Sequence, residues 1–240
     1  MTKSNPFGPP DVDGHIAPKS AAHIQRKLLK WGRANTFSYP WRETKNPWHA
    51  LTAEVMLQRT RAAQVLPIYL DLTTRYGNPE GWLADPHPLA FTGLGLPIRH
   101  EQYRALNQKL AGQRFPVTRD ALLSLPGVGD YIASAMLSFH LGQRAPIVDA
   151  NTVRLYGRLF GFQTHAETRR KTWFRRLAEQ LTPITAHRAY NYALLDLSRT
   201  ICTRHPLCAR CPLRSRCVSA QAGMYPRPHN ELIPERVLQM

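Results

Sequence analysis

The sequence predicts an all-α protein, and three observations carry this prediction. Apolar residues recur at helical spacing, for example in the run from Tyr131 to Leu141. The breaks between such runs are marked by Pro and Gly, as at Pro126 and Gly127. No internal repeat and no strand-rich segment interrupts this pattern. With 240 residues, 43% of them hydrophobic, the chain can bury one large core or two modest ones.

The predicted elements follow in order along the chain. Residues 1–19 are rich in Pro and Gly and lack periodicity, so we expect a flexible arm, and residues 221–240 are expected to form a tail. The first helix is expected over residues 21–33. Asn46 is expected to cap the second helix, which Pro47 opens at its first position. Further helices are expected over residues 62–76, 80–83, 99–110, 119–124, 131–141, 152–160, 166–181 and 185–199.

The charge balance points to an anionic partner. The formal net charge is +16, and 25 of the 32 positive side chains are arginine, which binds phosphate in a bidentate way. The sequence contains no apolar run long enough to span a bilayer and no apolar signal segment near its start, so we expect a cytoplasmic protein without a membrane partner. It also contains no P-loop, H-x-x-x-H or G-x-S-x-G motif, which excludes a nucleotide cofactor and two hydrolase classes.

A helix-turn-helix segment at Leu125, Gly127, Val128 and Gly129 is the first candidate site. Thr118 is expected to cap the short helix before it. The glycines allow positive φ and close backbone approach, so the amides that open the following helix can face an anion. The simpler alternative is a plain turn between two packed helices.

A lone acid follows this hairpin at a helix start. In the run 146–154, Pro-Ile-Val-Asp-Ala-Asn-Thr-Val-Arg, Asp149 precedes a helix. Asp in this place is either a structural N-cap or a functional carboxylate that the positive helix end stabilises. The sequence alone leaves both readings open.

All four cysteines lie in one short segment. Cys202, Cys208, Cys211 and Cys217 form a C-x5-C-x2-C-x5-C pattern, and no cysteine occurs elsewhere. In a chain without an export signal, such clustering indicates metal ligands rather than disulfides. Four thiolates fit tetrahedral zinc or a [4Fe-4S] cluster, and the spacing does not separate the two.

The hairpin, the acid and the cysteines together resemble the helix-hairpin-helix superfamily of DNA glycosylases. Relatives of endonuclease III and of the adenine mismatch enzyme carry an iron–sulfur loop with C-x6-C-x2-C-x5-C, one residue longer in the first interval than here. The resemblance favours a [4Fe-4S] cluster, with zinc as the alternative. It also implies a six-helix barrel domain over residues 40–145, an iron–sulfur domain built from residues 20–39 and 146–220, and a cleft between them.

The resemblance also implies roles for single residues. In the motif 53–60, Glu54 matches a residue of the base pocket, and Gln58 matches one that fills the gap left by an extruded nucleotide. Leu96 matches an apolar wedge in the base stack. Tyr131 stands where strand-cutting relatives have a nucleophilic lysine, and no lysine lies between residues 112 and 170, so little or no abasic-site lyase activity is expected.

The predicted function is a monofunctional DNA glycosylase of base excision repair. It would extrude a base from double-stranded DNA and hydrolyse its glycosidic bond, with Asp149 countering the positive charge on the sugar. Tyr131 together with residues 148–151 looks most like thymine-DNA mismatch glycosylases, which act on T or U opposite G. The alternatives are an adenine glycosylase acting opposite oxidised guanine, a glycosylase for another modified pyrimidine, and a DNA-binding module without catalysis. We expect a monomer of a bacterial or archaeal cytoplasm.

Overall fold

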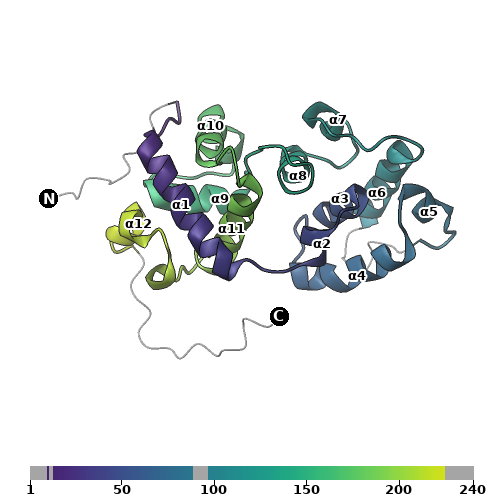
Figure 1. The fold of residues 1–240 in the computed structure, drawn as a ribbon, viewed down its shortest axis with the longest axis horizontal. Helices are drawn as coiled ribbons and strands as arrows, with labels where there is room; N and C mark the ends of the chain where they lie inside the picture. The colour runs from purple at the N-terminus through teal and green to yellow at the C-terminus, as the bar shows by residue number, and fades with distance from the viewer. Residues whose placement is uncertain (1–9, 11–12, 89–96, 225–240) are drawn as a thin grey trace. The chain divides into compact units, whose positions relative to one another are not determined.

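The computed structural model describes residue 10, residues 13–88 and residues 97–224. In these ranges every regular element is a helix, which confirms the all-α prediction (Figure 1). The chain divides into two compact units: one is formed by Ser38–Gln143, and the other combines Met1–Phe37 with Arg144–Gln239. No described helix is both long and apolar enough to cross a membrane.

Two helices of the unit formed by Ser38–Gln143 begin at the predicted caps. Asn46 accepts hydrogen bonds from the amides of Trp48 and His49, and Thr118 accepts one from Ala121, so both predicted caps are confirmed. The helices of this unit are α2 (Pro40–Glu43), α3 (Pro47–Met56), α4 (Ala62–Arg75), α5 (Pro79–Ala84), α6 (Pro97–Leu110), α7 (Arg119–Leu123), α8 (Asp130–Ala135) and the π-helix η2 (Met136–His140).

The second helix of the predicted hairpin differs from the expected regular helix over 131–141. It starts as α8 and continues without a break as η2, where the amide of Leu141 donates to the carbonyl of Met136 at 3.0 Å. Residues 132–139 are all buried, which means that this helix lies in the interior and has no solvent face. The π turn adds one residue to the helical repeat at this place.

The other unit contains the elements that flank the cysteines. Its helices are α1 (Pro18–Asn35), α9 (Ala150–Phe160), the 3-10 turn η3 (Thr168–Arg170), α10 (Thr172–Leu181), α11 (His187–Thr200), the 3-10 turns η4 (Cys208–Arg210) and η5 (Arg214–Arg216), and α12 (Val218–Gln221). The expected helix over 166–181 is therefore wrong in its first third. Lys171 is extended there, and α10 starts only at Thr172.

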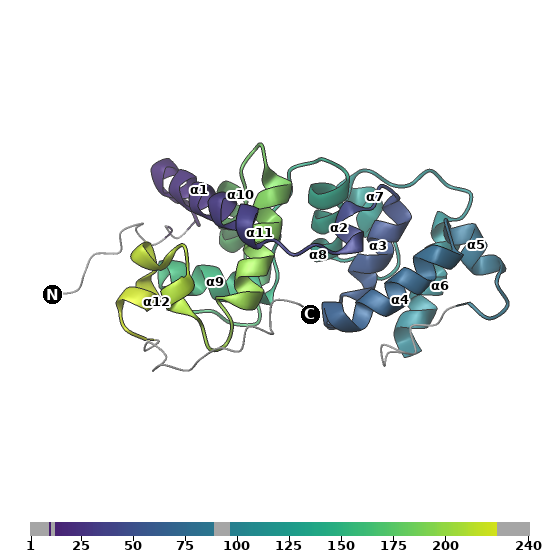
Figure 2. The ribbon, with the colours of Figure 1, turned by 60° about the horizontal axis from the view of Figure 1, so that its bottom comes forward.

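The core of this unit joins the first helix to the C-terminal half of the chain. α1 lies along α11, as both views of the ribbon show (Figures 1 and 2). Ile24 and Leu28 of α1 are fully buried in one cluster with the apolar faces of α9, α10 and α11. The main buried members from those helices are Tyr156, Leu159, Phe174, Leu177, Leu181, Tyr190, Leu194 and Leu197.

Residues 13–16, which the composition assigned to a flexible arm, are held against α10, and we call them the N-terminal strap. The amide of Ile16 donates to Gln180 Oε1 at 3.1 Å, and Gln180 Nε2 donates to the carbonyl of Gly14. Gly14 has φ of +82°, and a Cβ there would stand 1.9 Å from the carbonyl oxygen of Trp173. The strap therefore packs closely, and only glycine fits at this point.

Candidate active site and cysteine loop

Asp149 is the N-cap of α9 and is half-buried. Its Oδ1 accepts from the amide of Thr152 at 2.7 Å, and its Oδ2 accepts from Asn151 Nδ2 at 2.7 Å. The Thr152 hydroxyl completes the capping box, because it accepts from the Asp149 amide at 2.9 Å. Both carboxylate oxygens are thus fixed, and the structural cap and the candidate functional acid are the same group.

A chain of hydrogen bonds leads from Asp149 to the cysteine loop. Arg154 Nη1 donates to Asn151 Oδ1 at 3.0 Å, and its Nε donates to the carbonyl of Cys202 at 2.9 Å. A third bond joins Arg154 Nη2 to the carbonyl of Ser198 at 2.8 Å. Asn151 is therefore held by Arg154, and the carboxylate and the first cysteine share one polar network.

Arg158, one turn further along α9, contacts both ends of the cysteine loop. Its Nη1 lies 3.6 Å from Cys202 Sγ and also donates to the carbonyl of Thr203, while its own carbonyl accepts from Cys217 Sγ at 3.3 Å. Arg154 and Arg158 are two of the 25 arginines that make the chain basic. In the structure both side chains are partly buried and donate hydrogen bonds to carbonyls of the cysteine loop.

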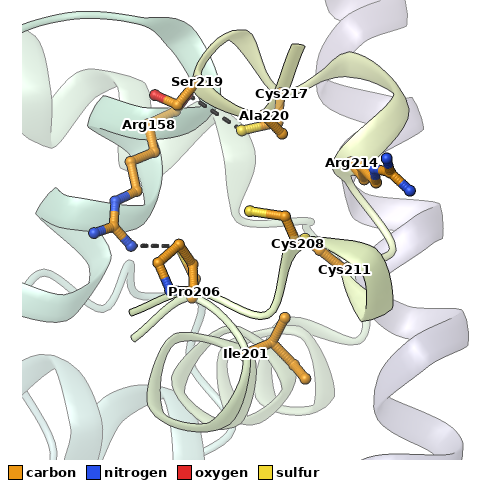
Figure 3. Close-up of a pocket in the computed structure, with 10 residues that line it drawn as sticks. Arg158, Ile201, Pro206, Cys208, Cys211, Arg214, Cys217, Ser219 and Ala220 are labelled. Atoms are coloured by element: carbon orange, nitrogen blue, oxygen red, sulfur yellow. Dashed lines mark hydrogen bonds between the residues drawn. The ribbon is translucent and has the colours of Figure 1, made fainter. Parts of the chain in front are cut away.

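The cysteines line one pocket (Figure 3). All four are free and half-buried, and the sulfurs of Cys208 and Cys217 point into the pocket. Burial raises the pKa of the Cys208 and Cys217 thiols, and it raises that of Cys211 to about 12. Among the described residues, no three His, Cys, Asp or Glu side chains are grouped so as to hold a metal ion.

Glu54 is buried in the Ser38–Gln143 unit. It lies on α3, is 4% exposed, and its Oε2 has no hydrogen-bond partner among the described residues. Burial raises the pKa of this carboxyl to about 7, although the Arg42 guanidinium acts to lower it. A buried carboxyl that titrates near neutral pH is a candidate acid or base. The raised pKa comes from burial, which the motif around Glu54 does not reveal.

The hairpin turn has the backbone of a tight loop. Leu125 and Val128 are buried, and the amide of Val128 donates to the carbonyl of Leu125 at 3.1 Å. Gly127 has φ of +76°, as expected. Gly129 does not use this freedom, because its φ is −103°. A Cβ at Gly129 would meet nothing within 4 Å, so the fold itself does not require glycine there.

Three further predicted site residues have different outcomes. Gln58, in the turn after α3, donates from Nε2 to the carbonyl of Gly127 at 3.2 Å, so the structure brings this residue to the hairpin. Tyr131 is half-buried in the first turn of α8. Leu96 lies outside the described residues. An ion pair that the sequence analysis missed joins Arg119 of α7 to Asp130 of α8 across the hairpin.

Comparison with known proteins finds DNA glycosylases, both by sequence and by structure. A thymine-DNA glycosylase of Aeropyrum pernix is 35% identical over 210 residues, which cover 81% of this chain and 93% of that protein. An adenine DNA glycosylase of Mycobacterium tuberculosis is 33% identical over 228 residues, 88% of this chain and 74% of the relative. The solved structure of a thermostable thymine-DNA glycosylase matches with a TM-score of 0.78 and 31% identity, covering 85% of this chain and 98% of that one.

A scan of family models found no match. The relatives nevertheless exceed 30% identity over most of both chains, and the fold is the same. The chain therefore belongs to the DNA glycosylases of base excision repair, in the superfamily built around a helix-hairpin-helix.

Proposed function

We propose that this glycosylase releases thymine or uracil paired with guanine and leaves the DNA strand uncut. The observation that carries the hydrolysis of the glycosidic bond is the fixed carboxylate of Asp149, held on both oxygens at the start of α9. The thymine-DNA glycosylase relative, which this chain spans almost completely, supports the choice of base. Thymine and uracil can also leave as stabilised anions, so the site needs less help for the leaving group than a purine would.

The proposed chemistry assigns Asp149 to the sugar. As the glycosidic bond breaks, the base departs with the bonding electrons and positive charge develops on the sugar. The carboxylate would stabilise this charge and orient or deprotonate the water that adds to the sugar carbon. The product is an abasic site and a free base. The Asn151 amide would keep the carboxylate from turning away during this step.

Glu54 would act on the departing base. At a pKa of about 7 this buried carboxyl is partly protonated at neutral pH, so it can donate a proton or a hydrogen bond to a base carbonyl. The Oε2 atom, which has no partner in the described part of the chain, is available for such a bond. Burial in an apolar helix thus gives Glu54 a task that differs from that of Asp149.

The absence of strand cleavage is proposed from Tyr131. A lyase needs an amine that attacks the sugar and forms a Schiff base, and no lysine occurs between residues 112 and 170. Incubation with an abasic duplex and borohydride should therefore trap no covalent complex. The Tyr131→Lys variant is expected to gain such a complex. Efficient trapping by the unchanged chain would contradict this part of the proposal.

A [4Fe-4S] cluster is proposed for the four cysteines. Zinc needs all four sulfurs within about 2.3 Å of one ion, whereas each thiolate of a cluster binds a different iron and the sulfurs stand farther apart. The four half-buried cysteines line one pocket, and this shared pocket supports a group that is held by four thiolates. The bound group would supply a crosslink of the loop. Purified protein should contain about four irons and four sulfides with visible absorption, and stoichiometric zinc instead would contradict the proposal.

The remaining assignments concern DNA and the domains. We assign the hairpin residues Leu125, Gly127, Val128 and Gly129 to a backbone phosphate, Gln58 to the gap left by the extruded nucleotide and Leu96 to the base stack. Residues 40–145 would be the barrel domain, and 20–39 with 146–220 the cluster domain. The protein would act as a monomer on double-stranded DNA.

Adenine release is the second candidate, and Glu54 favours it. A purine leaves poorly unless a ring nitrogen is protonated, and a buried carboxyl with a pKa of about 7 can supply that proton. The adenine DNA glycosylase at 33% identity supports the same reading. The residues of the hairpin and of α9 do not separate the two candidates.

A panel of duplexes tests the proposal and separates the candidates. It contains G·T and G·U pairs, adenine opposite oxidised guanine, and modified cytosines, with abasic sites scored by alkali cleavage. Release from G·T and G·U, without strand cuts before alkali, is the expected result. Release of adenine alone would favour the second candidate. Duplex binding without any base release would reduce the protein to a DNA-binding module.

A further inference from the structure

The hairpin turn is flanked by a negative charge that a phosphate site would exclude. Asp130 is the first residue of the continuous helix formed by α8 and η2, and its side chain is 52% exposed. The Cα–Cβ bonds of a helix lean toward its N-terminus, so an acid at this position tends to cover the free amides of the first turn. There it would repel a phosphate that approaches Gly127 and Gly129.

Arg119 contacts this carboxylate. Its Nη2 lies 2.5 Å from Asp130 Oδ1, and its Nη1 donates to Ser134 Oγ at 3.0 Å. Ser134 is 4% exposed and lies one turn further along the helix than Asp130. The guanidinium is therefore fixed between these two residues, and its positive charge lies beside the Asp130 carboxylate.

Fold stability gives little reason for this pair. Arg119 is 40% exposed in its side chain, and exposed ion pairs contribute little to folding. Thr118 already caps α7, and Leu122 already anchors it in the core. The pair does change the charge beside the hairpin turn, because Arg119 neutralises the Asp130 carboxylate.

We propose that Arg119, anchored by Ser134, is a positioning residue for DNA binding that withdraws and neutralises Asp130 so that the hairpin turn can receive a backbone phosphate. The inference rests on the proposed contact between the hairpin and DNA. It explains how the hairpin can bind a DNA phosphate although Asp130 lies at the start of the second hairpin helix.

A double-mutant cycle on the full chain tests the inference, with a labelled G·T duplex and Kd measured at about 50 mM salt. Arg119→Gln is expected to weaken binding about tenfold and Asp130→Asn to tighten it about threefold. In the Asp130→Asn background, loss of Arg119 should cost less than about threefold. An equal cost in both backgrounds would mean that Arg119 binds phosphate itself, and this would overturn the proposal, as would an Asp130→Asn variant that binds no more tightly.

Two further variants separate positioning from net charge. Ser134→Ala changes no charge but frees the guanidinium, so about two- to threefold weaker binding is expected, and unchanged binding overturns the positioning role. Arg75→Gln is the matched control, because Arg75 forms an exposed ion pair with Asp71 on α4. A loss as large as that of Arg119→Gln would show a general charge effect and overturn the proposal.

Two further measurements complete the experiment: the salt dependence of Kd, and duplex binding by the unchanged chain. All differences should shrink as salt rises, because exposed charges are screened. If the unchanged chain binds no duplex, the proposed function fails. If it binds and all variants bind alike, only the inference about Arg119 fails.

Discussion

The two carboxylates proposed for catalysis lie in contrasting surroundings. Asp149 is half-buried and both of its oxygens accept hydrogen bonds, as an ionised carboxylate does. Glu54 is almost completely buried, one of its oxygens has no partner in the described residues, and its pKa is raised to about 7. Identical chemical groups are thus prepared for different tasks, one as a fixed anion and one as a proton donor.

The largest expected effect is that of removing the anion. Asp149→Asn keeps the shape and the cap but removes the negative charge below the sugar. We expect base release under single-turnover conditions to fall about a thousandfold, while duplex affinity changes less than about threefold. Equal losses of binding and of product would show that Asp149 serves the fold or the DNA contact instead.

The next largest effect concerns the proton on Glu54. If the protonated form acts, the rate of base release falls about tenfold per pH unit above pH about 7, because the pKa of Glu54 is near that value. Glu54→Gln should be about a hundredfold slower and lose this pH dependence. A rate that rises through the same range would assign Glu54 to the attacking water and remove the contrast with Asp149.

The same carboxyl should make stability depend on pH. Its pKa in the folded chain lies above the ordinary value of 4.5, so the folded state binds the proton more tightly than the unfolded state. This contribution is fully present below pH about 4.5 and is lost as pH rises to about 7, a fall of about 3 kcal/mol in the free energy of unfolding. Urea unfolding of the unchanged chain and of Glu54→Gln, at pH about 5 and about 8, should show the variant gaining relative stability at the higher pH. A difference that does not vary with pH would place Glu54 in contact with water.

The smallest expected effect concerns the orientation of the Asp149 carboxylate. Asn151→Ala removes the bond to Asp149 Oδ2 and leaves the bond from the Thr152 amide. Base release should slow about tenfold at unchanged duplex affinity, since the carboxylate is less well oriented. Asn78→Ala, which removes a cap of α5 in the other unit, is the control and should leave the rate unchanged.

Features set by neighbouring residues could be predicted from the sequence, and features set by distant ones could not. The predicted caps at Asn46 and Thr118 are confirmed, because each side chain accepts from an amide two or three residues ahead. Asp149, for which the sequence left the cap open, forms the same kind of bond. The positive φ at Gly127 was likewise a local consequence of its turn. These signals located most helices and the hairpin.

The hydrogen-bond partners of Arg154 and Arg158 could not be predicted, because these partners are remote in the sequence. Arg154 and the carbonyl of Cys202 are 48 residues apart, so nothing in the local sequence distinguishes a loop-binding arginine from a phosphate-binding one. The break before α10 and the π turn η2 were missed for a related reason: both depend on packing around the segment rather than on its own residues.

The N-terminal strap limits how many residues can be removed from the N-terminus. Removing the first twelve residues leaves Asp13, the bonds of Gln180 and the tight seat of Gly14 against Trp173 in place. Removing five more would take the buried side chain of Ile16 out of the core cluster and leave the Gln180 amide without those partners. Expression fragments intended for crystallisation or for labelled samples should therefore begin no later than Asp13.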